Sequence, residues 1–413
     1  MKTNNKLHSS VLASAAVVLF LILVSSTASA SISETRITTH GTASSPVIYG
    51  NNIVWQDLRN GNWDIYILDL STKKQIGTTN QADQTDPAIY GNKVVWTDGR
   101  NGGSDIYMQD ISSKKQTRIT TSGQASMPDI YGNKIVYSKY AANDDESWHE
   151  LYMYDLSSKK VTQIPTIISS FVPAVYGNKI VWLDFNSFNG RDYYIYTYDL
   201  STKKQTQITK NDFSKGEMVD MPDIYGNRIV WQDNRNGNWD IYMYDLSTKK
   251  EVQITTNKSD QQAPAIYGNT IVWQDNRNGN WNIYAYDLTT RQQIHTTSKS
   301  DQVAPAVYGN KIVWTDYRNG QDKPDIYMGT LSYLPVAAFT ASPTTGKAPL
   351  TVKFTDKSTD AYYWSWNFGD KSTSKDQSPV HKYTKAGKYT VTLTVKNAAG
   401  SNTAKKTNYI TVK

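Results

Sequence analysis

A phrase of the form Pro-x-(Val/Ile)-Tyr-Gly-Asn recurs seven times and limits the possible folds of this chain more than any other feature. Successive copies are separated by 41, 41, 45, 49, 42 and 41 residues. A steady period of this length is the sequence signature of a repeat architecture, in which each copy forms one supersecondary unit. The seven prolines are Pro46, Pro87, Pro128, Pro173, Pro222, Pro264 and Pro305.

Each copy divides into four short apolar runs that read as strands. In the fifth copy, the first run follows Pro222 and ends at a Tyr-Gly-Asn turn, where Gly and Asn tolerate a positive φ. The next three runs are residues 229–231, 240–245 and 253–255. Four strands in each period predict the blade of a β-propeller. Neighbouring blades cover both faces of a blade, which explains why the apolar runs are continuous rather than alternating.

The two ends of the repeat array complement each other. The last copy ends at residues 325–328 and has no fourth strand, whereas residues 35–38, Thr-Arg-Ile-Thr, form a fourth strand without a preceding copy. This strand stands at the same distance from Pro46 as the fourth strand of the second copy does from Pro128. We therefore expect it to complete the seventh blade and close the ring, which removes free sheet edges.

The repeats over residues 34–332 resemble TolB-type propeller repeats, with Tyr-Gly-Asn standing where that family usually has Ser-Pro-Asp-Gly. The resemblance implies a fold and leaves the function open, because one fold hosts many functions. The fold class expected for the chain is all-β: a seven-bladed β-propeller over residues 31–332, followed by a second domain.

The composition changes after Tyr333, and residues 335–413 are expected to form that second domain. Apolar residues at 389, 391, 393 and 395 alternate with polar ones, as in a half-buried strand of a β-sandwich. The run Trp-Asn-Phe-Gly-Asp at 366–370 and the His-x-Tyr at 381–383 resemble a PKD domain, with Asn367 where the family commonly has Asp. This resemblance implies an immunoglobulin-like sandwich that acts as an extracellular spacer or adhesion unit.

Residues 1–30 have the pattern of a secretion signal: two lysines, an apolar run at 11–24 and a small-residue Ala-Ser-Ala end. We therefore expect an extracellular or cell-surface protein without a membrane span once the signal is cleaved. The chain has no cysteine, which excludes disulfides and thiolate metal sites. Its formal charge is +7, two units of which belong to the signal, and no dense Lys/Arg run predicts a nucleic-acid partner.

Length differences among the copies fall almost wholly between the second and third strands, with one longer connection after the fourth copy. The long segments are residues 139–150, 184–194 and 210–220. Both kinds of loop lie on the same side of a propeller, so we expect that side to be the binding face. The opposite side carries Ser-Thr-Lys-Lys turns, whose lysines form either a solvated rim or a seat for an anionic polymer.

The phrase Arg-Asn-Gly-Asn-Trp lies within the expected binding face. Its Asn-Gly is a strong hairpin signal, and Asp57, Asp233 and Asp275 are expected to cap the turn. The tryptophans either pack against the next blade or stack on a sugar ring or protein partner. Asn257 begins a glycosylation sequon on the same side. The predicted ligand-binding residues are Trp63, Trp148, Trp239, Trp281, Arg59, Arg235 and Arg277.

The sequence predicts no catalytic residue, metal ligand or cofactor. His40, His149, His295 and His381 stand far apart in the sequence, and neither Gly-x-Ser-x-Gly nor His-Glu-x-x-His occurs. The Asp-x-Arg-Asn-Gly loops lack the ligand order of a calcium loop, and their arginine would repel a cation.

The expected function is that of a non-catalytic binding or adhesion protein, monomeric in solution, whose partner is a cell-wall polysaccharide or a surface protein. The signal, propeller and PKD-like module together resemble cell-surface or surface-layer proteins of methanogenic archaea. Two alternatives remain: a secreted polysaccharide lyase or hydrolase on a propeller scaffold, and a structural subunit of a surface lattice.

Overall fold

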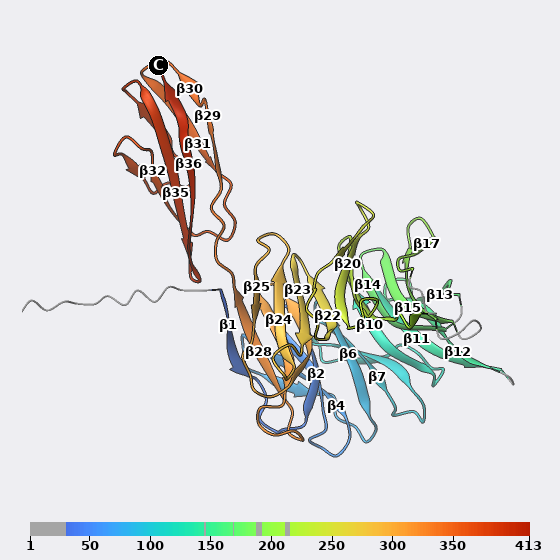
Figure 1. The fold of residues 1–413 in the computed structure, drawn as a ribbon. Coiled ribbons are helices and arrows are strands. Elements are labelled where there is room, and N and C mark those ends of the chain that lie inside the picture. The colour runs from blue at the N-terminus through green and yellow to red at the C-terminus, as the bar shows by residue number, and fades with distance from the viewer. Residues whose placement is uncertain (1–29, 144–145, 168, 187–191, 211–214) are drawn as a thin grey trace, which may run out of the picture.

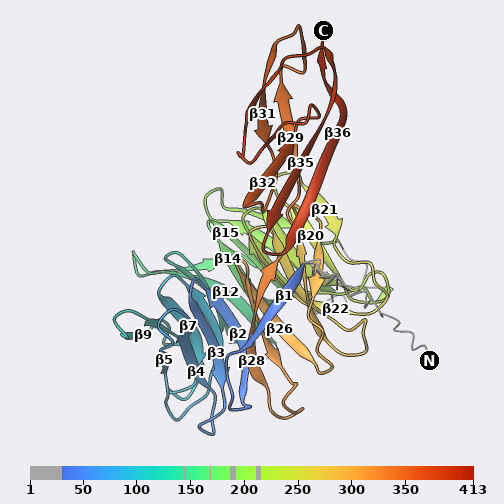
Figure 2. The same cartoon turned by 90° about the vertical axis from the view of Figure 1, so that its left-hand side faces the viewer.

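The computed structural model describes residues 30–143, 146–167, 169–186, 192–210 and 215–413, and this part of the chain is all-β (Figure 1). It contains a propeller and a separate C-terminal sandwich, which Figure 2 shows from a second side. The predicted signal peptide of residues 1–30 lies, except for its last residue, outside the described residues. Among the described residues, no helix is long and apolar enough to span a membrane.

Seven four-stranded antiparallel sheets form the blades of the propeller. Blade one has β2 (Ala43–Tyr49), β3 (Asn52–Asp57), β4 (Asp64–Asp69) and β5 (Gln75–Gly77), and blade two has β6 (Gln84–Tyr90), β7 (Lys93–Asp98), β8 (Asp105–Asp110) and β9 (Gln116–Arg118). Blade three has β10 (Ala125–Tyr131), β11 (Lys134–Ala142), β12 (Ser147–Asp155) and β13 (Lys160–Ile164), and blade four has β14 (Ser169–Tyr176), β15 (Lys179–Asn186), β16 (Asp192–Asp199) and β17 (Lys204–Gln207). Blade five has β18 (Val219–Tyr225), β19 (Arg228–Asp233), β20 (Asp240–Asp245) and β21 (Lys250–Gln253), and blade six has β22 (Gln261–Tyr267), β23 (Thr270–Asp275), β24 (Asn282–Asp287) and β25 (Gln293–His295).

Blade seven joins the two ends of the propeller. It consists of β26 (Gln302–Tyr308), β27 (Lys311–Asp316), β28 (Asp325–Ser332) and, as its fourth strand, the N-terminal β1 (Ser31–Arg36). Strand β1 pairs antiparallel with β28 from Ser31 opposite Ser332 to Arg36 opposite Tyr327. The predicted fold class, seven blades closed by an N-terminal strand, is therefore confirmed.

The blades pack on one another through a repeated aromatic pair. The second strand of every blade contributes a fully or almost fully buried ring, which stacks on the tyrosine of the third strand; in blade five, Trp231 and Tyr242 have ring centroids 6.0 Å apart. Truncation of one such indole typically costs on the order of 3–5 kcal/mol. The seven buried rings are Trp55, Trp96, Tyr137, Trp182, Trp231, Trp273 and Trp314.

The first strand of each blade lines the central channel and contains a β-bulge. The residue before the repeat proline has a positive φ between 47° and 53° in every blade. In five blades its N–H donates to a side chain of the preceding blade, for example from Ala263 to Oε1 of Gln232 at 2.8 Å. At the junction of blades four and five, Leu183 replaces this acceptor, and Met221 N–H donates to Asp220 instead.

The strand order gives the disc two different sides. The turns within Tyr-Gly-Asn and the Lys-containing turns between third and fourth strands lie on one side, called the turn face here. The loops between second and third strands, and those that lead into the next blade, lie on the other side, the loop face. Strand β1 begins and β28 ends on the turn face.

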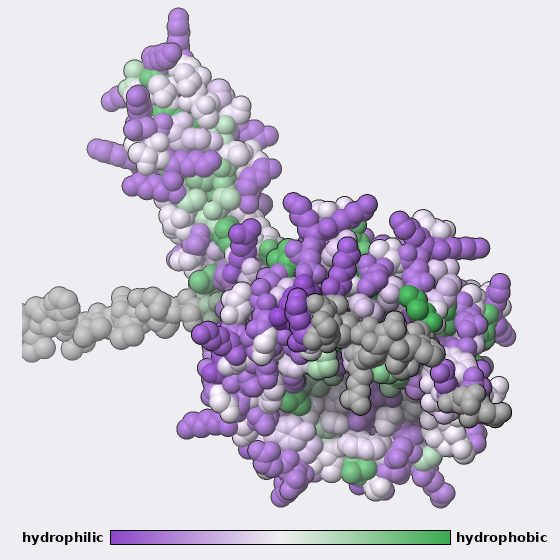
Figure 3. All heavy atoms as spheres, turned by 45° about the vertical axis from the view of Figure 1, so that its right-hand side comes forward, coloured by the Kyte–Doolittle hydropathy of each residue, from purple (hydrophilic) through white to green (hydrophobic). Residues whose placement is uncertain are grey.

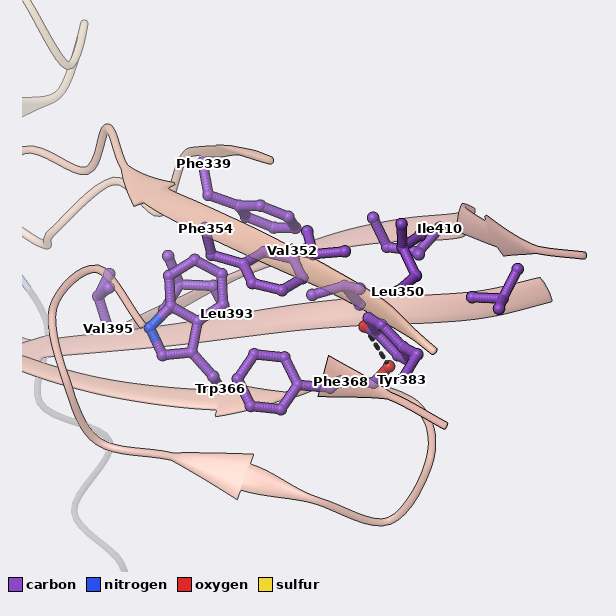
Figure 4. Packing of buried hydrophobic residues seen from close by; sticks show 12 residues of the cluster. Phe339, Leu350, Val352, Phe354, Trp366, Phe368, Tyr383, Leu393, Val395 and Ile410 are labelled. Carbon is purple, nitrogen blue, oxygen red and sulfur yellow. Dashed lines mark hydrogen bonds between the residues drawn. The ribbon is translucent and has the colours of Figure 1, made fainter. Parts of the chain in front are cut away.

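The C-terminal sandwich packs a three-stranded sheet on a five-stranded sheet. Its core is a cluster of rings and branched side chains that includes Phe354, Trp366 and Tyr383 (Figure 4). The Tyr383 hydroxyl donates to the Phe368 carbonyl at 3.0 Å. The first sheet contains β29 (Phe339–Ser342), β31 (Leu350–Asp356) and β34 (Val380–Tyr383), and the second contains β30 (Thr345–Gly346), β32 (Tyr363–Asn367), β33 (Thr373–Ser374), β35 (Gly387–Asn397) and β36 (Gly400–Val412).

The sandwich follows directly from blade seven. The side chain of Gln292 in blade six accepts from Leu334 N–H at 3.1 Å and donates to the Leu334 carbonyl at 2.9 Å. Asn397, at the end of β35, donates to the Tyr333 carbonyl at 2.8 Å. These bonds hold the connection between the two domains at the turn face of the propeller.

Candidate functional site

The Asp-x-Arg-Asn-Gly phrase builds a closed hydrogen-bonded turn on the loop face. In blade one, the fully buried Asp57 carboxylate accepts from the Trp55 indole at 3.0 Å and from Arg59 N–H at 3.0 Å. The Arg59 guanidinium also binds Asp57 and lies 3.9 Å from the centre of the Tyr66 ring. Burial by itself raises the pKa of Asp57, but hydrogen bonds from Arg59, Thr42 and Trp55 hold that pKa below its ordinary value.

Five blades share this arrangement of carboxylate, guanidinium and tyrosine ring. Each arginine pairs with the buried aspartate two residues before it and covers the third-strand tyrosine of its own blade. The structure thus places Arg59, Arg235 and Arg277 in turns, where each guanidinium pairs with the buried carboxylate of its own turn. A ligand-binding role for these arginines stays a prediction. The five arginine–tyrosine pairs are Arg59–Tyr66, Arg100–Tyr107, Arg235–Tyr242, Arg277–Tyr284 and Arg318–Tyr327.

The predicted tryptophans are half-buried and are distributed around the propeller. The main chain of Trp239 is held by the next blade, since its N–H donates to Asp260 at 3.0 Å and its carbonyl accepts from Gln261 at 2.7 Å. Trp63 and Trp281 are held in the same way. Trp148 lies on β12 of blade three. The four side chains come from blades one, three, five and six and form no single cluster, so their binding role also stays a prediction.

A different set of side chains distinguishes blades three to five. At the bulge before the repeat proline, these blades carry Met127, Val172 and Met221, which are 37%, 37% and 43% exposed. The other four blades have small or polar residues at this position: Ser45, Asp86, Ala263 and Ala304. Three consecutive blades thus present apolar side chains on the channel-lining strand near the loop face. An alignment of the seven repeats on their prolines shows this difference in residue type at the position before the proline, but it does not show the exposure of the side chains.

The loops of the same blades add further exposed apolar groups. Tyr140 on β11, Ile167 before β14 and Met218 before β18 are 41%, 56% and 38% exposed. Tyr140 also joins a small aromatic cluster, with His149 5.6 Å from Tyr140 and 4.4 Å from Phe171 between ring centroids. Burial lowers the pKa of His149, so this imidazole is neutral near pH 7. We call the six exposed side chains the loop-face patch: Met127, Tyr140, Ile167, Val172, Met218 and Met221.

The central channel also differs in this sector. At the residue after the repeat proline, blades three and five carry Asp129 and Asp223, whereas the other blades carry Ala or Val. Asp129 accepts from Val175 N–H at 2.7 Å and Asp223 from Ile266 N–H at 2.8 Å, so each carboxylate binds the first strand of the next blade. Burial in the channel raises the pKa of Asp129 to about 7 and raises that of Asp223 as well.

A ring of seven tyrosines surrounds the channel at the turn face. Neighbouring ring centroids are 4.5–4.9 Å apart all the way round. The tyrosines and the two aspartates line a cavity of about 200 Å³. In the described ranges, no three His, Cys, Asp or Glu side chains come together as a metal site would require. The tyrosines of the ring are Tyr49, Tyr90, Tyr131, Tyr176, Tyr225, Tyr267 and Tyr308.

Comparison with protein families identifies the C-terminal part of the chain. Residues 334–412 match the PKD domain family. A stretch of 48 residues is 48% identical to Collagenase ColA of Bacillus cereus; it covers 12% of this chain and 5% of the collagenase. The resemblance of the C-terminal module to a PKD domain is therefore confirmed. Both matches point to an extracellular context.

Comparison with solved structures supports the propeller. The propeller domain of the Trilobed protease from Pyrococcus furiosus aligns with a TM-score of 0.54 at 14% identity, over 71% of this chain and 94% of that one. Pyrococcus horikoshii acylaminoacyl peptidase aligns with a TM-score of 0.55 at 11% identity, over 76% of this chain and 57% of the peptidase. An oligogalacturonate lyase in complex with manganese aligns with a TM-score of 0.52 at 13% identity, over 74% of this chain and 97% of the lyase. At these identities the likeness concerns the fold alone. The Trilobed protease propeller is described as an open velcro, whereas here β1 pairs with β28.

Proposed function

We propose that this protein is a non-catalytic binding protein of the cell surface, in which the loop face of the propeller binds another surface protein and the PKD domain acts as a spacer or adhesion module. The main support for the proposal is the identity and exposure of the residue before the repeat proline in each blade. Three adjacent blades expose Met127, Val172 and Met221 there, and the remaining blades carry no apolar side chain larger than alanine at this position. Apolar side chains gathered on one exposed face are typical of a partner-binding surface.

The chemistry of the loop-face patch favours a protein over a glycan. Methionine adapts its shape to an apolar partner and is enriched in protein interfaces. A sugar ring would instead stack on flat aromatic faces, for which Trp63, Trp148, Trp239 and Trp281 are the candidates. These four side chains are half-buried, and two of them, Trp63 and Trp281, belong to blades that contribute nothing to the patch. The proposed partner is therefore a protein, and glycan binding by the tryptophans is the alternative that the experiment separates.

The chain connections leave the proposed binding face open. Strand β1 begins and the PKD domain leaves on the turn face, so the loop face is free of both connections. The proposal includes secretion by the predicted signal of residues 1–30. It also includes kinship with the cell-surface or surface-layer proteins of methanogenic archaea, which the signal, propeller and PKD module together resemble.

Catalysis is the competing function, because the propellers of similar fold include those of peptidases and of a lyase. The lyase alternative predicts release of unsaturated oligosaccharides from polygalacturonate. The peptidase alternative predicts peptide release from a protein substrate. Neither product is expected from the mature protein under our proposal, whatever metal ion is supplied.

Binding of the mature protein to immobilised surface proteins of its own cells, and to an array of acidic and neutral glycans, tests the proposal. The patch variant carries Met127→Ser, Val172→Ser and Met221→Ser; the matched variant carries Trp63→Ala, Trp239→Ala and Trp281→Ala. If each patch side chain contributes about 1 kcal/mol as interface residues do, the patch variant loses binding by roughly 100-fold. Glycan binding that only the tryptophan variant loses would contradict the proposal, as would no binding at all.

A further inference from the structure

The charge of the chain is concentrated in its C-terminal domain. Residues 335–413 contain twelve lysines, four aspartates and neither Arg nor Glu, a formal charge of +8. Residues 31–334 contain thirty basic and thirty-three acidic residues, a formal charge of −3. Such an asymmetry between domains indicates that the basic part has an anionic partner.

The lysines of the PKD domain are not neutralised within the domain. All its residues are described, and none of its lysines forms an ion pair with a carboxylate; its one ion pair is between His381 and Asp370, at 2.7 Å. Three of the four aspartates, Asp356, Asp370 and Asp376, bind other groups; Asp356, for example, accepts from the Trp364 indole at 2.8 Å. Lys406 donates to the Phe339 carbonyl at 2.8 Å. Figure 3 shows hydrophilic side chains that project from this domain.

The outer face of the five-stranded sheet holds several of these lysines on a flat polar surface. Its long strands β35 and β36 turn Val391, Leu393 and Ile410 inward, so their alternate residues face outward. Thr394 and Thr403 meet across the two strands with hydroxyl oxygens 2.8 Å apart. The other outward residues of β32, β35 and β36 are Tyr363, Ser365, Asn367, Lys388, Thr392, Lys396, Ser401 and Lys405.

An exposed aromatic ring stands on the same face. Tyr363 is 69% exposed and lies directly opposite Lys396 in the sheet register. Lys405 lies opposite Thr392, midway between Lys396 and Lys388 along β35. At about 3.3 Å per residue, the three lysines are spaced about 13 Å apart over roughly 27 Å. We call Tyr363, Lys388, Lys396 and Lys405 the lysine–tyrosine face.

We propose that the lysine–tyrosine face of the PKD domain binds an acidic polysaccharide, independently of the partner of the propeller. An extended polyanion can contact all three ammonium groups at once. A sugar ring can stack on Tyr363, and the serine, threonine and asparagine side chains offer donors and acceptors to its hydroxyl groups. Arginine, the residue best suited to bidentate phosphate contacts, is absent from the domain, which favours a carboxylated or sulfated sugar over a nucleic acid.

The test measures the affinity of the full mature chain for polygalacturonate, with fully methyl-esterified polygalacturonate as the neutral probe. The face variant carries Lys388→Gln, Lys396→Gln and Lys405→Gln. The matched control carries Lys353→Gln, Lys357→Gln and Lys382→Gln, which remove the same charge at exposed positions of the opposite sheet and just after its β31. We expect the wild type to bind polygalacturonate and not its methyl ester. The face variant should lose more than tenfold in affinity for polygalacturonate, and the control variant less than threefold. Tyr363→Ala, which leaves the charge unchanged, should lower the affinity for polygalacturonate several-fold.

Three results would overturn the proposal. One is a wild-type protein that binds neither polygalacturonate nor a sulfated dextran at 50 mM salt. Another is an equal loss in the two lysine variants, which would indicate diffuse charge rather than a defined face. The third is tighter binding to duplex DNA or to phosphatidylglycerol vesicles with the same dependence on the three lysines. The propeller patch variant Met127→Ser, Val172→Ser, Met221→Ser should bind polygalacturonate like the wild type, so a failure of this proposal is distinguishable from a failure of the proposed propeller function.

Discussion

Replacement of Asp316 by alanine should weaken the blade that closes the ring. Asp316 is fully buried at the end of β27, and its carboxylate accepts from the Trp314 indole at 2.9 Å and the Gln302 amide at 2.7 Å. It also pairs with Arg318 at 2.7 Å. Alanine leaves the indole and the amide buried without this acceptor.

The expected loss follows from these contacts. Removal of one partner of a buried ion pair costs about 3–5 kcal/mol. Arg318 is 30% exposed and also binds Glu34 at 2.6 Å, so its charge retains solvent and a second carboxylate. We therefore expect the lower end, about 3 kcal/mol for Asp316→Ala. Asp287→Ala is the control, because that carboxylate caps an accessible turn through Thr289 N–H at 2.9 Å and should contribute about 1 kcal/mol.

Guanidinium denaturation of the mature protein, followed by tryptophan fluorescence, measures both variants. The shift of the midpoint at constant slope gives the change in the free energy of unfolding. Burial by itself raises the pKa of Asp316, but the hydrogen bonds from Arg318, Gln302 and Trp314 lower that pKa by more, so the net shift is downward. Its contribution is therefore complete above the unfolded pKa near 4 and is lost as the pH falls through the lower folded pKa. Equal shifts for Asp316→Ala and Asp287→Ala would refute the role assigned to the buried carboxylate.

Three further perturbations have defined outcomes. Asp129, whose pKa burial raises to about 7, takes up a proton on folding between pH 4 and 7, so stability falls as pH rises through this window; Asp129→Asn should flatten that dependence in denaturation curves. Deletion of residues 31–38 removes β1 and exposes the edge of β28, which should lower the unfolding midpoint and give dimers or larger species in size-exclusion chromatography. Lys249 has a φ of 55° in its turn, so Lys249→Gly should raise stability by roughly 0.5–1 kcal/mol by thermal unfolding, whereas Lys250→Gly, its neighbour in β21, should not.

The repeat made the fold predictable in detail. The regular recurrence of the proline phrase predicted the blades. The extra strand before the first copy, matched by the missing fourth strand of the last copy, predicted the closing strand. The expected strand of residues 35–38 and the observed β1 (Ser31–Arg36) differ in extent because β28 continues to Ser332 and offers partners to earlier residues. Ile37 and Thr38 still bond to β28, through Ile37 N–H to the Ile326 carbonyl at 2.8 Å and Thr38 Oγ1 to Asp325 at 2.8 Å.

The candidate site was predictable only in part. The sequence indicated that the loops of blades three and four are special, and the exposed side chains Tyr140 and Met218 belong to the long segments 139–150 and 210–220, whereas Ile167 lies in a connection of ordinary length. The contact of each arginine with an aspartate two residues away depends on the backbone of the turn, which residue types alone do not determine. The exposure of Met127, Val172 and Met221 depends on a bulge with positive φ at a non-glycine residue, for which the sequence carries no local signal.

Site-specific photo-crosslinking can show whether the sector of the loop face formed by blades three to five contacts a partner protein. A photoreactive amino acid replaces Met127, Val172 or Met221 in one series, and Ser45, Ala263 or Ala304, the same position of other blades, in the control series. After illumination at the surface of the producing cells, we expect a defined protein adduct from all three positions of blades three to five and none from the controls. Adducts of equal yield from both series, or from the control series alone, would contradict this expectation.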